Sequence, residues 1–401
     1  MPSAPPPGDP APADGALPAD ALAGERPLSL YLHVPFCATR CGYCDFNTYT
    51  AAELGSAPGA SRQAYLAAVR AELDLAVRVL GGPRPVETVF FGGGTPTMLE
   101  PTELTGLLDA VRQRFPLAPD AEVTTEANPE SVDPAYLDAL AAAGFNRLSL
   151  GMQSAVPRVL AVLDRRHTPG RVGEVVGWAR AAGFGSVSLD LIYGTPGESP
   201  TDWRDSLRAA LALTPDHVSA YSLIVEPGTR LAARVRRGEL PDIDDDVHAA
   251  YYLAAEQELT AAGLAWYEVS NWARAGHRAR HNLAYWRSHD WWGIGPGAHS
   301  HVGGVRWWNL RHPSTYSARL AAGESPAQAR EVLTSADRRT EQVLLELRLA
   351  DGIGLDILTD TERRRAQNVA AAGHAAVVDD RLRLTLSGRL LADGIVRDLL
   401  D

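Results

Sequence analysis

The sequence is poor in cysteine: its 401 residues contain three, Cys37, Cys41 and Cys44, and all three lie within eight positions. No thiol elsewhere in the chain can complete a four-cysteine metal site. Structural disulfides are also disfavoured, because three cysteines leave one unpaired and loops this short fit disulfide geometry poorly. Any chemistry of these thiols therefore takes place on one loop.

Concentrated positive charge is lacking as well. The formal net charge is −11 and the isoelectric point is near 5.5, which argues against nucleic acid as a partner, since binding phosphates requires a positive surface. The chain has no apolar run of about 18 residues, so the sequence predicts no membrane span. The N-terminus has no basic region followed by an apolar core, as a secretory signal has. We therefore expect a soluble cytoplasmic protein with reduced thiols.

The three cysteines are spaced C-x3-C-x2-C, and an aromatic residue, Tyr43, precedes the third. Three thiolates on such a loop can each hold one iron of a [4Fe–4S] cluster and leave the fourth iron open. The alternative is a structural zinc ion, for which His33 can supply the fourth ligand. The spacing alone leaves both metal sites open.

The rest of the chain predicts an α/β fold. Residues 1–27 hold eight prolines and little to bury, so we expect a disordered tail. Apolar runs then alternate with segments of helical periodicity. The predicted strands are 28–34, 86–91, 122–126, 147–150, 187–192 and 218–224, and the predicted helices are 65–80, 101–115, 134–143, 155–163, 171–182 and 201–212. This order predicts a parallel sheet, either a partial (β/α)6 barrel or an open doubly wound sheet, with its site at the carboxyl ends of the strands.

Candidate site residues follow four successive strands of this prediction. Gly93, Gly94 and Thr95 follow the second strand, where glycine lets a ligand approach the backbone closely. The others are Glu126 after the third strand, Gln153 after the fourth, Arg165 near the end of the next helix, and Asp190 with Ile192 on the fifth. A tight turn, a helix cap or a surface charge explains each residue by itself, but their common position favours one site.

Together with C-x3-C-x2-C, these stretches resemble the radical S-adenosylmethionine (SAM) enzymes. The resemblance implies that SAM chelates the open iron, and that the reduced cluster cleaves SAM to methionine and a 5′-deoxyadenosyl radical. It favours the partial barrel. It also implies a cofactor-binding set: Tyr31, Tyr43, Gly93, Gly94, Thr95, Glu126, Gln153, Arg165, Asp190 and Ile192, with Cys37, Cys41 and Cys44 as the cluster ligands.

Over residues 28–400, a narrower resemblance rests on YLHVPFC, GGGTPT, EANPES, GMQS, RRHT and DLIYGTPGE. These stretches are similar to those of oxygen-independent coproporphyrinogen III oxidases and of the related HemW-type heme chaperones. The oxidases carry a further cysteine two places after the third, where this sequence has Phe46. That difference favours the chaperones, which implies heme and heme-accepting proteins as partners. The alternatives are the oxidase itself and a radical SAM enzyme acting on heme, so catalytic activity is left open.

Residues 266–312 hold seven of the nine tryptophans and six of the eleven histidines. Indole rings offer flat apolar surfaces and imidazole is an axial ligand of heme iron, so the region suits a macrocycle. A packed core between domains explains the same residues. His281 begins HNLAYW, which resembles an HN-x-x-YW stretch of the HemW-type proteins and makes His281 the predicted heme ligand. A buried structural histidine is the alternative.

The sequence thus predicts four parts. They are a disordered tail (1–27), a radical SAM barrel (28–230), an aromatic and histidine-rich connecting region (231–330) and a small α+β C-terminal domain (331–401). In the last part we expect helices over 341–349, 361–373 and 388–400 and a strand over 381–385. Nothing in this C-terminal part predicts chemistry of its own.

Overall fold

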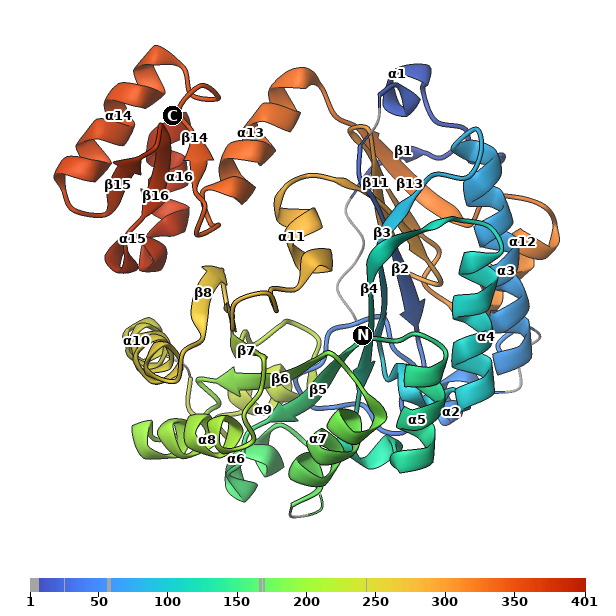
Figure 1. The fold of residues 1–401 in the computed structure, drawn as a ribbon, viewed down its shortest axis with the longest axis horizontal. Coiled ribbons are helices and arrows are strands. Elements are labelled where there is room, and N and C mark those ends of the chain that lie inside the picture. The colour runs from blue at the N-terminus through green and yellow to red at the C-terminus, as the bar shows by residue number, and fades with distance from the viewer. Residues whose placement is uncertain (1–6, 25, 56–58, 166–167, 169, 243) are drawn as a thin grey trace.

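The computed structural model describes residues 7–24, 26–55, 59–165, 168, 170–242 and 244–401. Its framework is a curved sheet (Figure 1). Six parallel strands follow one another in chain order: β2 (Leu28–Val34), β3 (Val86–Gly93), β4 (Leu117–Ala127), β5 (Arg147–Gln153), β6 (Ser186–Tyr193) and β7 (His217–Ser222). The strands β2 and β7 are not neighbours, so the barrel stays open. The predicted α/β class is confirmed.

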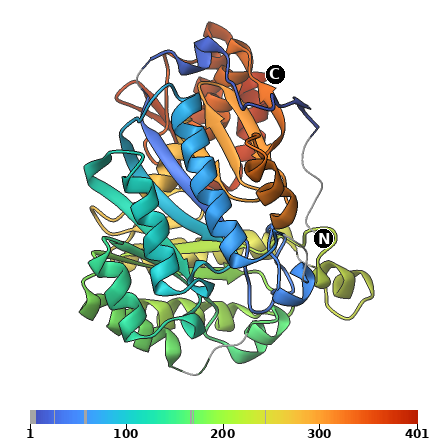
Figure 2. The ribbon, with the colours of Figure 1, turned by 90° about the vertical axis from the view of Figure 1, so that its right-hand side faces the viewer.

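Helices of the parallel unit cover the outer face of the sheet (Figures 1 and 2). They are α3 (Arg62–Val79), α4 (Pro101–Arg112), α5 (Pro134–Ala142), α6 (Pro157–Val162), α7 (Arg171–Ala182) and α8 (Pro200–Ala212). The helix α11 (Arg280–Trp286) lies on the opposite, concave side (Figure 1). None of the helices in the described ranges is long and apolar enough to cross a membrane.

The helix α3 shows how the sequence specifies these elements. Its apolar residues Tyr65, Val69 and Leu73 recur every four positions and are fully buried, as expected for a helix packed on a sheet. Ser61 begins the helix by accepting a hydrogen bond from the backbone N–H of Ala64 at 3.1 Å. Strand β2 is buried on both faces, which is typical of a parallel strand between a helix layer and a core.

The aromatic region extends both edges of this same sheet instead of forming a separate connecting part. On the β7 side lie β8 (Ala265–Glu268) and β9 (Asn271–Ala273), preceded by α9 (Arg230–Arg236) and α10 (Asp245–Ala261). On the β2 side lie β10 (Asp290–Ile294), β11 (His299–Val302), β12 (Val305–Asn309) and β13 (Ala327–Val332), with α12 (Pro313–Ala321) before β13. Five of its seven tryptophans are buried and lie on strands of this sheet: Trp266, Trp272, Trp292, Trp307 and Trp308. Arg389 of the C-terminal part stacks over the Trp266 ring.

The described part of the N-terminal tail differs from the expected disorder. Strand β1 (Asp9–Pro10) pairs antiparallel with β13, and α1 (Ala19–Leu22) follows it. A backbone hydrogen bond also fixes the tail between β1 and α1, because the N–H of Ser325 donates to the carbonyl oxygen of Ala13. Its prolines are tolerated because β1 is an edge strand, where one backbone side needs no partner. Residues 1–6 and 25 lie outside the described residues.

The C-terminal part has its own sheet and its own core. The sheet has the order β14–β16–β15, and the elements are α13 (Ser335–Glu346), β14 (Ile353–Gly354), α14 (Asp360–Ala371), β15 (Ala375–Val378), β16 (Arg381–Leu384), α15 (Leu386–Leu390) and α16 (Ala392–Leu400). Its buried residues include Val343, Ile353, Leu382 and Leu399. In Figure 1 this part stands beside the open side of the large sheet.

A buried carboxylate joins the outer helix layer to the β2 edge of the sheet. Glu72 on α3 is fully buried and accepts hydrogen bonds from Gly295 N at 2.8 Å, Asn309 Nδ2 at 2.7 Å and Tyr316 Oη at 2.5 Å. Burial raises the pKa of Glu72 to about 7, although these hydrogen bonds act in the opposite direction. The folded protein therefore holds a proton here more tightly than an unfolded chain does.

Glu72→Gln is expected to change the pH dependence of stability. Because the folded pKa is raised, the contribution of Glu72 is present in full below pH 4.5 and is lost as the pH rises to about 7. We expect the free energy of unfolding to lose about 3 kcal/mol from this group over that window, and the loss to be absent in Glu72→Gln. Urea unfolding at several pH values measures it. Glu174→Gln, at an exposed position of α7, is the control, and parallel pH profiles for all three proteins contradict the prediction.

Candidate functional site

The cysteine loop follows β2 and ends before α2 (Ala51–Leu54). Its two ends are held together, because Cys37 N donates to Tyr49 O at 3.0 Å and Tyr49 N donates to Pro35 O at 2.7 Å. Within the loop, Cys44 N donates to Cys41 O at 3.3 Å. All three thiols are free and partly exposed. The loop thus presents three sulfur donors at the carboxyl end of β2.

The end of β3 packs directly against this loop. Gly94 N donates to Val34 O and Thr95 N donates to Phe36 O, both at 2.8 Å, and Thr95 Oγ1 lies 3.9 Å from Cys37 Sγ. A Cβ atom on Gly94 would lie 2.6 Å from the Phe36 carbonyl oxygen and 3.1 Å from Cys37 Sγ. Only glycine permits this approach, which explains the glycine run predicted at this strand end.

A cation lies on the other side of the loop. Arg165, in the turn after α6, donates from Nη1 to Cys41 Sγ at 3.7 Å and from Nη2 to Gly151 O at 3.0 Å. The Gln153 amide lies against the same glycine, at a residue with a positive φ of 66°. Positive charge at this distance stabilises an anionic sulfur ligand. The structure therefore brings Arg165 to the cysteine loop and places Gln153 beside the glycine that Arg165 binds.

The donor set fits an iron–sulfur cluster better than zinc. The imidazole of His33 is engaged at both nitrogens, with Nε2 2.9 Å from Asn47 O and Nδ1 3.0 Å from Tyr31 Oη. A zinc ion would have to displace one of these partners to gain His33 as its fourth ligand. Burial raises the pKa of the Cys37 thiol and raises that of Cys44 to about 11, so metal binding at these sulfurs must release protons.

Two carboxylates lie on β4 and β6, the two strands that flank β5. Glu126 Oε2 accepts from Gly93 N at 3.0 Å, and both oxygens of Asp190 lie 3.0 Å from Ser149 Oγ. Burial raises the pKa of Glu126 to about 8, and the charge of Asp190 raises it further. Burial also raises the pKa of Asp190. Neither forms an ion pair within the described part of the chain, so the pair suits a ligand that carries positive charge.

The remaining predicted residues line the apolar side of this region. Ile192 is buried in a small cluster with Leu163, Leu223 and Leu231, and Tyr43 packs against that cluster. The position of the Tyr43 ring within the cysteine loop therefore depends on residues of β6 and of the segment after β7. An apolar wall of this kind excludes water from one side of a bound cofactor.

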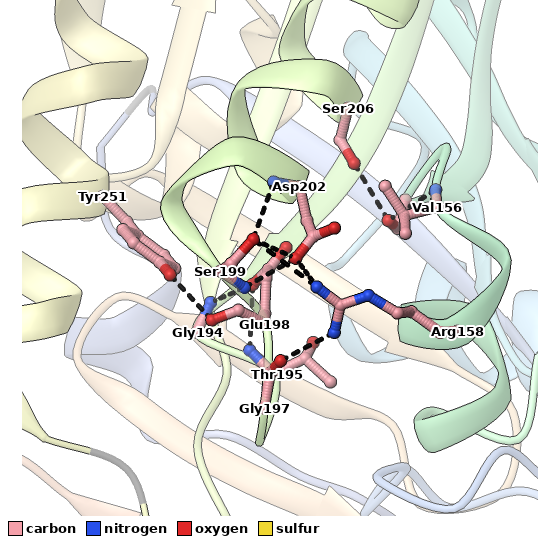
Figure 3. A network of polar contacts seen from close by, with 11 residues as sticks. Val156, Arg158, Gly194, Thr195, Gly197, Glu198, Ser199, Asp202, Ser206 and Tyr251 are labelled. Atoms are coloured by element: carbon pink, nitrogen blue, oxygen red, sulfur yellow. Dashed lines mark hydrogen bonds and ion pairs between the residues drawn. The ribbon is translucent and has the colours of Figure 1, made fainter.

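A polar network holds the segment that follows β6 (Figure 3). Glu198 Oε2 accepts from the backbone N–H of Gly194 at 2.7 Å and of Thr195 at 3.1 Å. Arg158 on α6 bonds Asp202 of α8 and donates to the carbonyl oxygen of Gly197. The network therefore fixes the chain just beyond Asp190 and Ile192 without using any of the predicted site residues.

Asn47 and Ser149 contribute to the site but were missed in the sequence. Asn47 Nδ2 donates to Pro296 O at 2.9 Å and to Arg311 O at 2.8 Å, so it ties the cysteine loop to the segment after β10. Alternation along β5 could have indicated Ser149, since it shares a strand face with Gly151. No sequence signal pointed to Asn47, because its partners lie more than 240 positions away.

His281 is on α11, inside the concave face of the sheet, and is 1% exposed. Its Nδ1 lies 2.7 Å from Thr88 Oγ1 and its Nε2 lies 2.8 Å from Tyr285 Oη. Its ring stacks on that of Phe90 with centroids 5.0 Å apart. Burial lowers the pKa of His281 to about 3, so the ring is neutral. Both nitrogens are occupied, and an iron atom would have to displace one of these partners.

The fold and the site define a radical SAM protein. Residues 31–210 match the Radical SAM superfamily, and radical SAM proteins use a [4Fe–4S] cluster and SAM. The chain is 56% identical over 375 residues to the heme chaperone HemW of Mycobacterium tuberculosis (strain H37Rv), covering 94% of this chain and 95% of that protein. It belongs to the HemW family of radical SAM proteins.

Two further relatives extend this comparison. The heme chaperone HemW of Escherichia coli (strain K12) is 42% identical over 276 residues, covering 69% of this chain and 70% of that protein. Among solved structures, coproporphyrinogen III oxidase (HemN) from Escherichia coli has a TM-score of 0.80 at 25% identity, covering 95% of this chain and 92% of that chain. The shared fold therefore includes the C-terminal part as well as the barrel.

The cysteine loop and the pair of buried carboxylates, Glu126 and Asp190, are expected to respond differently to substitution. After anaerobic reconstitution, Cys41→Ala should lose the cluster absorbance, because no other cysteine can replace it. Glu126→Ala and Asp190→Ala should retain iron but bind SAM about tenfold more weakly, as expected for the loss of a charge-assisted contact. Iron analysis and calorimetric titration with SAM measure the two effects. Glu174→Ala serves as the control, and SAM affinity equal to that of the unmodified protein in both carboxylate variants contradicts the assignment.

Proposed function

We propose that this protein binds heme and delivers it to heme-accepting proteins, and that it does so in the cytoplasm. The observation that carries the proposal is the 56% identity to a heme chaperone HemW over 94% of this chain. That identity extends through the aromatic and histidine-rich region as well as the cysteine loop. Heme and the acceptor proteins are thus the proposed partners.

Within this function, Cys37, Cys41 and Cys44 are the proposed ligands of the cluster. A cluster with one open iron binds SAM and supplies an electron to it. The buried carboxylates Glu126 and Asp190 are placed to attract the positively charged part of SAM, and Gly94 lets the end of β3 pack against the cysteine loop. Arg165 balances negative charge at the Cys41 sulfur.

The second candidate function is oxygen-independent coproporphyrinogen III oxidation. The structural likeness to coproporphyrinogen III oxidase (HemN) favours it. The residue two places after Cys44 argues against it, because Phe46 stands where the oxidases have a cysteine. Phe46 is 59% exposed, so its side chain is an apolar surface at the cysteine loop and offers no metal-binding or proton-transfer group. We therefore place the chaperone function first.

Two measurements on the reconstituted full chain separate these functions. Hemin titration should give a saturable change in the Soret band, and the loaded protein should pass heme to an apo-hemoprotein such as apomyoglobin. Incubation with SAM, reductant and coproporphyrinogen III should yield no protoporphyrinogen IX. Steady formation of that product would overturn the chaperone function in favour of the oxidase.

His281 is the proposed heme ligand, and its burial sets the expected result of a substitution. Because His281 must give up Thr88 or Tyr285 to reach iron, His281→Ala should shift the Soret band and weaken heme binding by about tenfold without abolishing it. Apolar contact with the macrocycle supplies the remaining affinity. The matched control is His374→Ala in the C-terminal part. An unchanged heme spectrum and heme affinity in His281→Ala would contradict this proposal and show that His281 has a structural role.

A further inference from the structure

A cleft of about 510 Å3 lies between the turn joining β11 to β12 and the helix α13. Four arginines contribute to its lining, Arg26, Arg287, Arg338 and Arg339, whereas Glu341 is its one carboxylate. This lining is positive although the whole chain carries a formal net charge of −11. Such a local reversal of charge is typical of a site for an anionic ligand.

One face of α13 forms a wall of this cleft. Ser335, Arg338, Arg339 and Gln342 all line it, and they are spaced as neighbours on one side of a helix. Ser335 and Arg338 lie in the first turn of the helix, where the helix dipole adds partial positive charge. The helix therefore presents two guanidinium groups and two neutral hydrogen-bonding groups to the same space, together with the carboxylate of Glu341, which is paired with Arg306.

The arginines of the lining differ in their partners. Three of them form ion pairs with carboxylates outside the lining: Arg26 with Asp290 at 3.0 Å, Arg287 with Asp351 at 2.8 Å, and Arg339 with Glu362. Arg338 has no carboxylate partner among the described residues, and it donates to the carbonyl oxygen of Gly303 at 3.3 Å. Arg338 is thus the guanidinium with most capacity left for an added anion.

A neighbouring cleft supplies a contrast. It has a similar volume of about 510 Å3 and also contains Arg287, together with Arg381 and Arg383. Its lining includes two carboxylates, Glu346 and Asp351, and Arg287 forms its ion pair with the second of these. Charge in that cleft is largely balanced by its own walls, so the cleft beside Arg338 is the better anion site.

The arginine cleft adjoins the predicted heme region. Arg287 directly follows the HNLAYW stretch, and His301 also lines the cleft. The ring of His301 lies 4.9 Å from that of Trp291, which lies 4.8 Å from that of Tyr285 within HNLAYW. His301 Nδ1 donates to the carbonyl oxygen of His289 at 3.1 Å, which leaves Nε2 as a lone-pair donor on the neutral ring.

We propose that this arginine cleft binds a small dianion, with Arg338 as its main contact, and that in the heme-loaded protein the dianion is the pair of heme propionates. The assignment of the dianion to the heme propionates rests on the proposed function. Guanidinium groups bind carboxylates through two parallel hydrogen bonds, and the aromatic run from Tyr285 to His301 offers the macrocycle an apolar neighbour. Phosphates share this oxyanion chemistry, so pyrophosphate is the probe for the cleft without heme.

The test compares the full chain with Arg338→Gln and Arg287→Gln, and uses Arg364→Gln, at an exposed position of α14, as the matched control. Each protein is titrated with hemin, with hemin dimethyl ester, which lacks both carboxylate charges, and with pyrophosphate. We expect the unmodified protein to bind hemin about tenfold more tightly than the ester. Arg338→Gln should remove that preference and weaken pyrophosphate binding, Arg287→Gln should reduce both, and Arg364→Gln should change neither.

The outcomes separate this site from the proposed function. Hemin affinity that is equal for the unmodified protein and Arg338→Gln, with heme still bound, overturns the propionate assignment and leaves heme binding intact. Failure of the unmodified protein to bind hemin overturns the proposed function, and pyrophosphate binding that depends on Arg338 then supports the dianion site alone. Pyrophosphate binding that is absent, or unchanged in Arg338→Gln, overturns the dianion site itself.

Discussion

The parallel pairing of β10 with β2 is the constraint on which the site depends. It places Gly293 beside Tyr31 and Ile294 beside Leu32, so the chain after β10 emerges next to the cysteine loop. A Cβ atom on Gly295 would lie 2.5 Å from the carbonyl oxygen of His33. Close backbone contact of this kind is possible only for glycine. The cysteine loop is therefore supported by a segment some 250 residues later, as well as by its own strand.

Two buried carboxylates, Glu72 and Glu126, fix the backbone segments that surround the cysteine loop. Glu72 holds the segment after β10 from the helix side, and Glu126 holds Gly93 from within the sheet. Burial raises the pKa of both groups, to about 7 and about 8, so each is costly to ionise without a partner. Glu72 accepts hydrogen bonds from three protein donors, whereas within the described residues Glu126 accepts one, from Gly93 N. That contrast separates a structural carboxylate from one suited to a charged ligand.

The concave face of the sheet has two distinct regions. Toward the carboxyl ends of the strands lie the cysteine loop and the residues proposed to contact SAM. The helix α11 occupies the rest of that face and carries the HNLAYW stretch, whose His281 reaches Thr88 of β3. Its ring lies 6.4 Å from that of Tyr31, which in turn bonds His33 near the cysteine loop. The proposed heme region and the cluster region are thus joined through a short run of packed aromatic side chains.

The sequence by itself determined the local elements and their chemistry. Hydrophobic periodicity predicted the alternating strands and helices, and the C-x3-C-x2-C spacing with Gly94, Glu126 and Asp190 at strand ends predicted one site, because parallel strands bring their carboxyl ends to one edge. Only the tertiary structure decided the features that depend on contacts between segments far apart in the chain. It placed β10–β13 on the edge beside β2, ordered the described part of the tail against β13, buried His281 between Thr88 and Tyr285, and gathered the arginines around Arg338. Such contacts depend on strand order and on packing between segments far apart in the chain, which local periodicity does not encode.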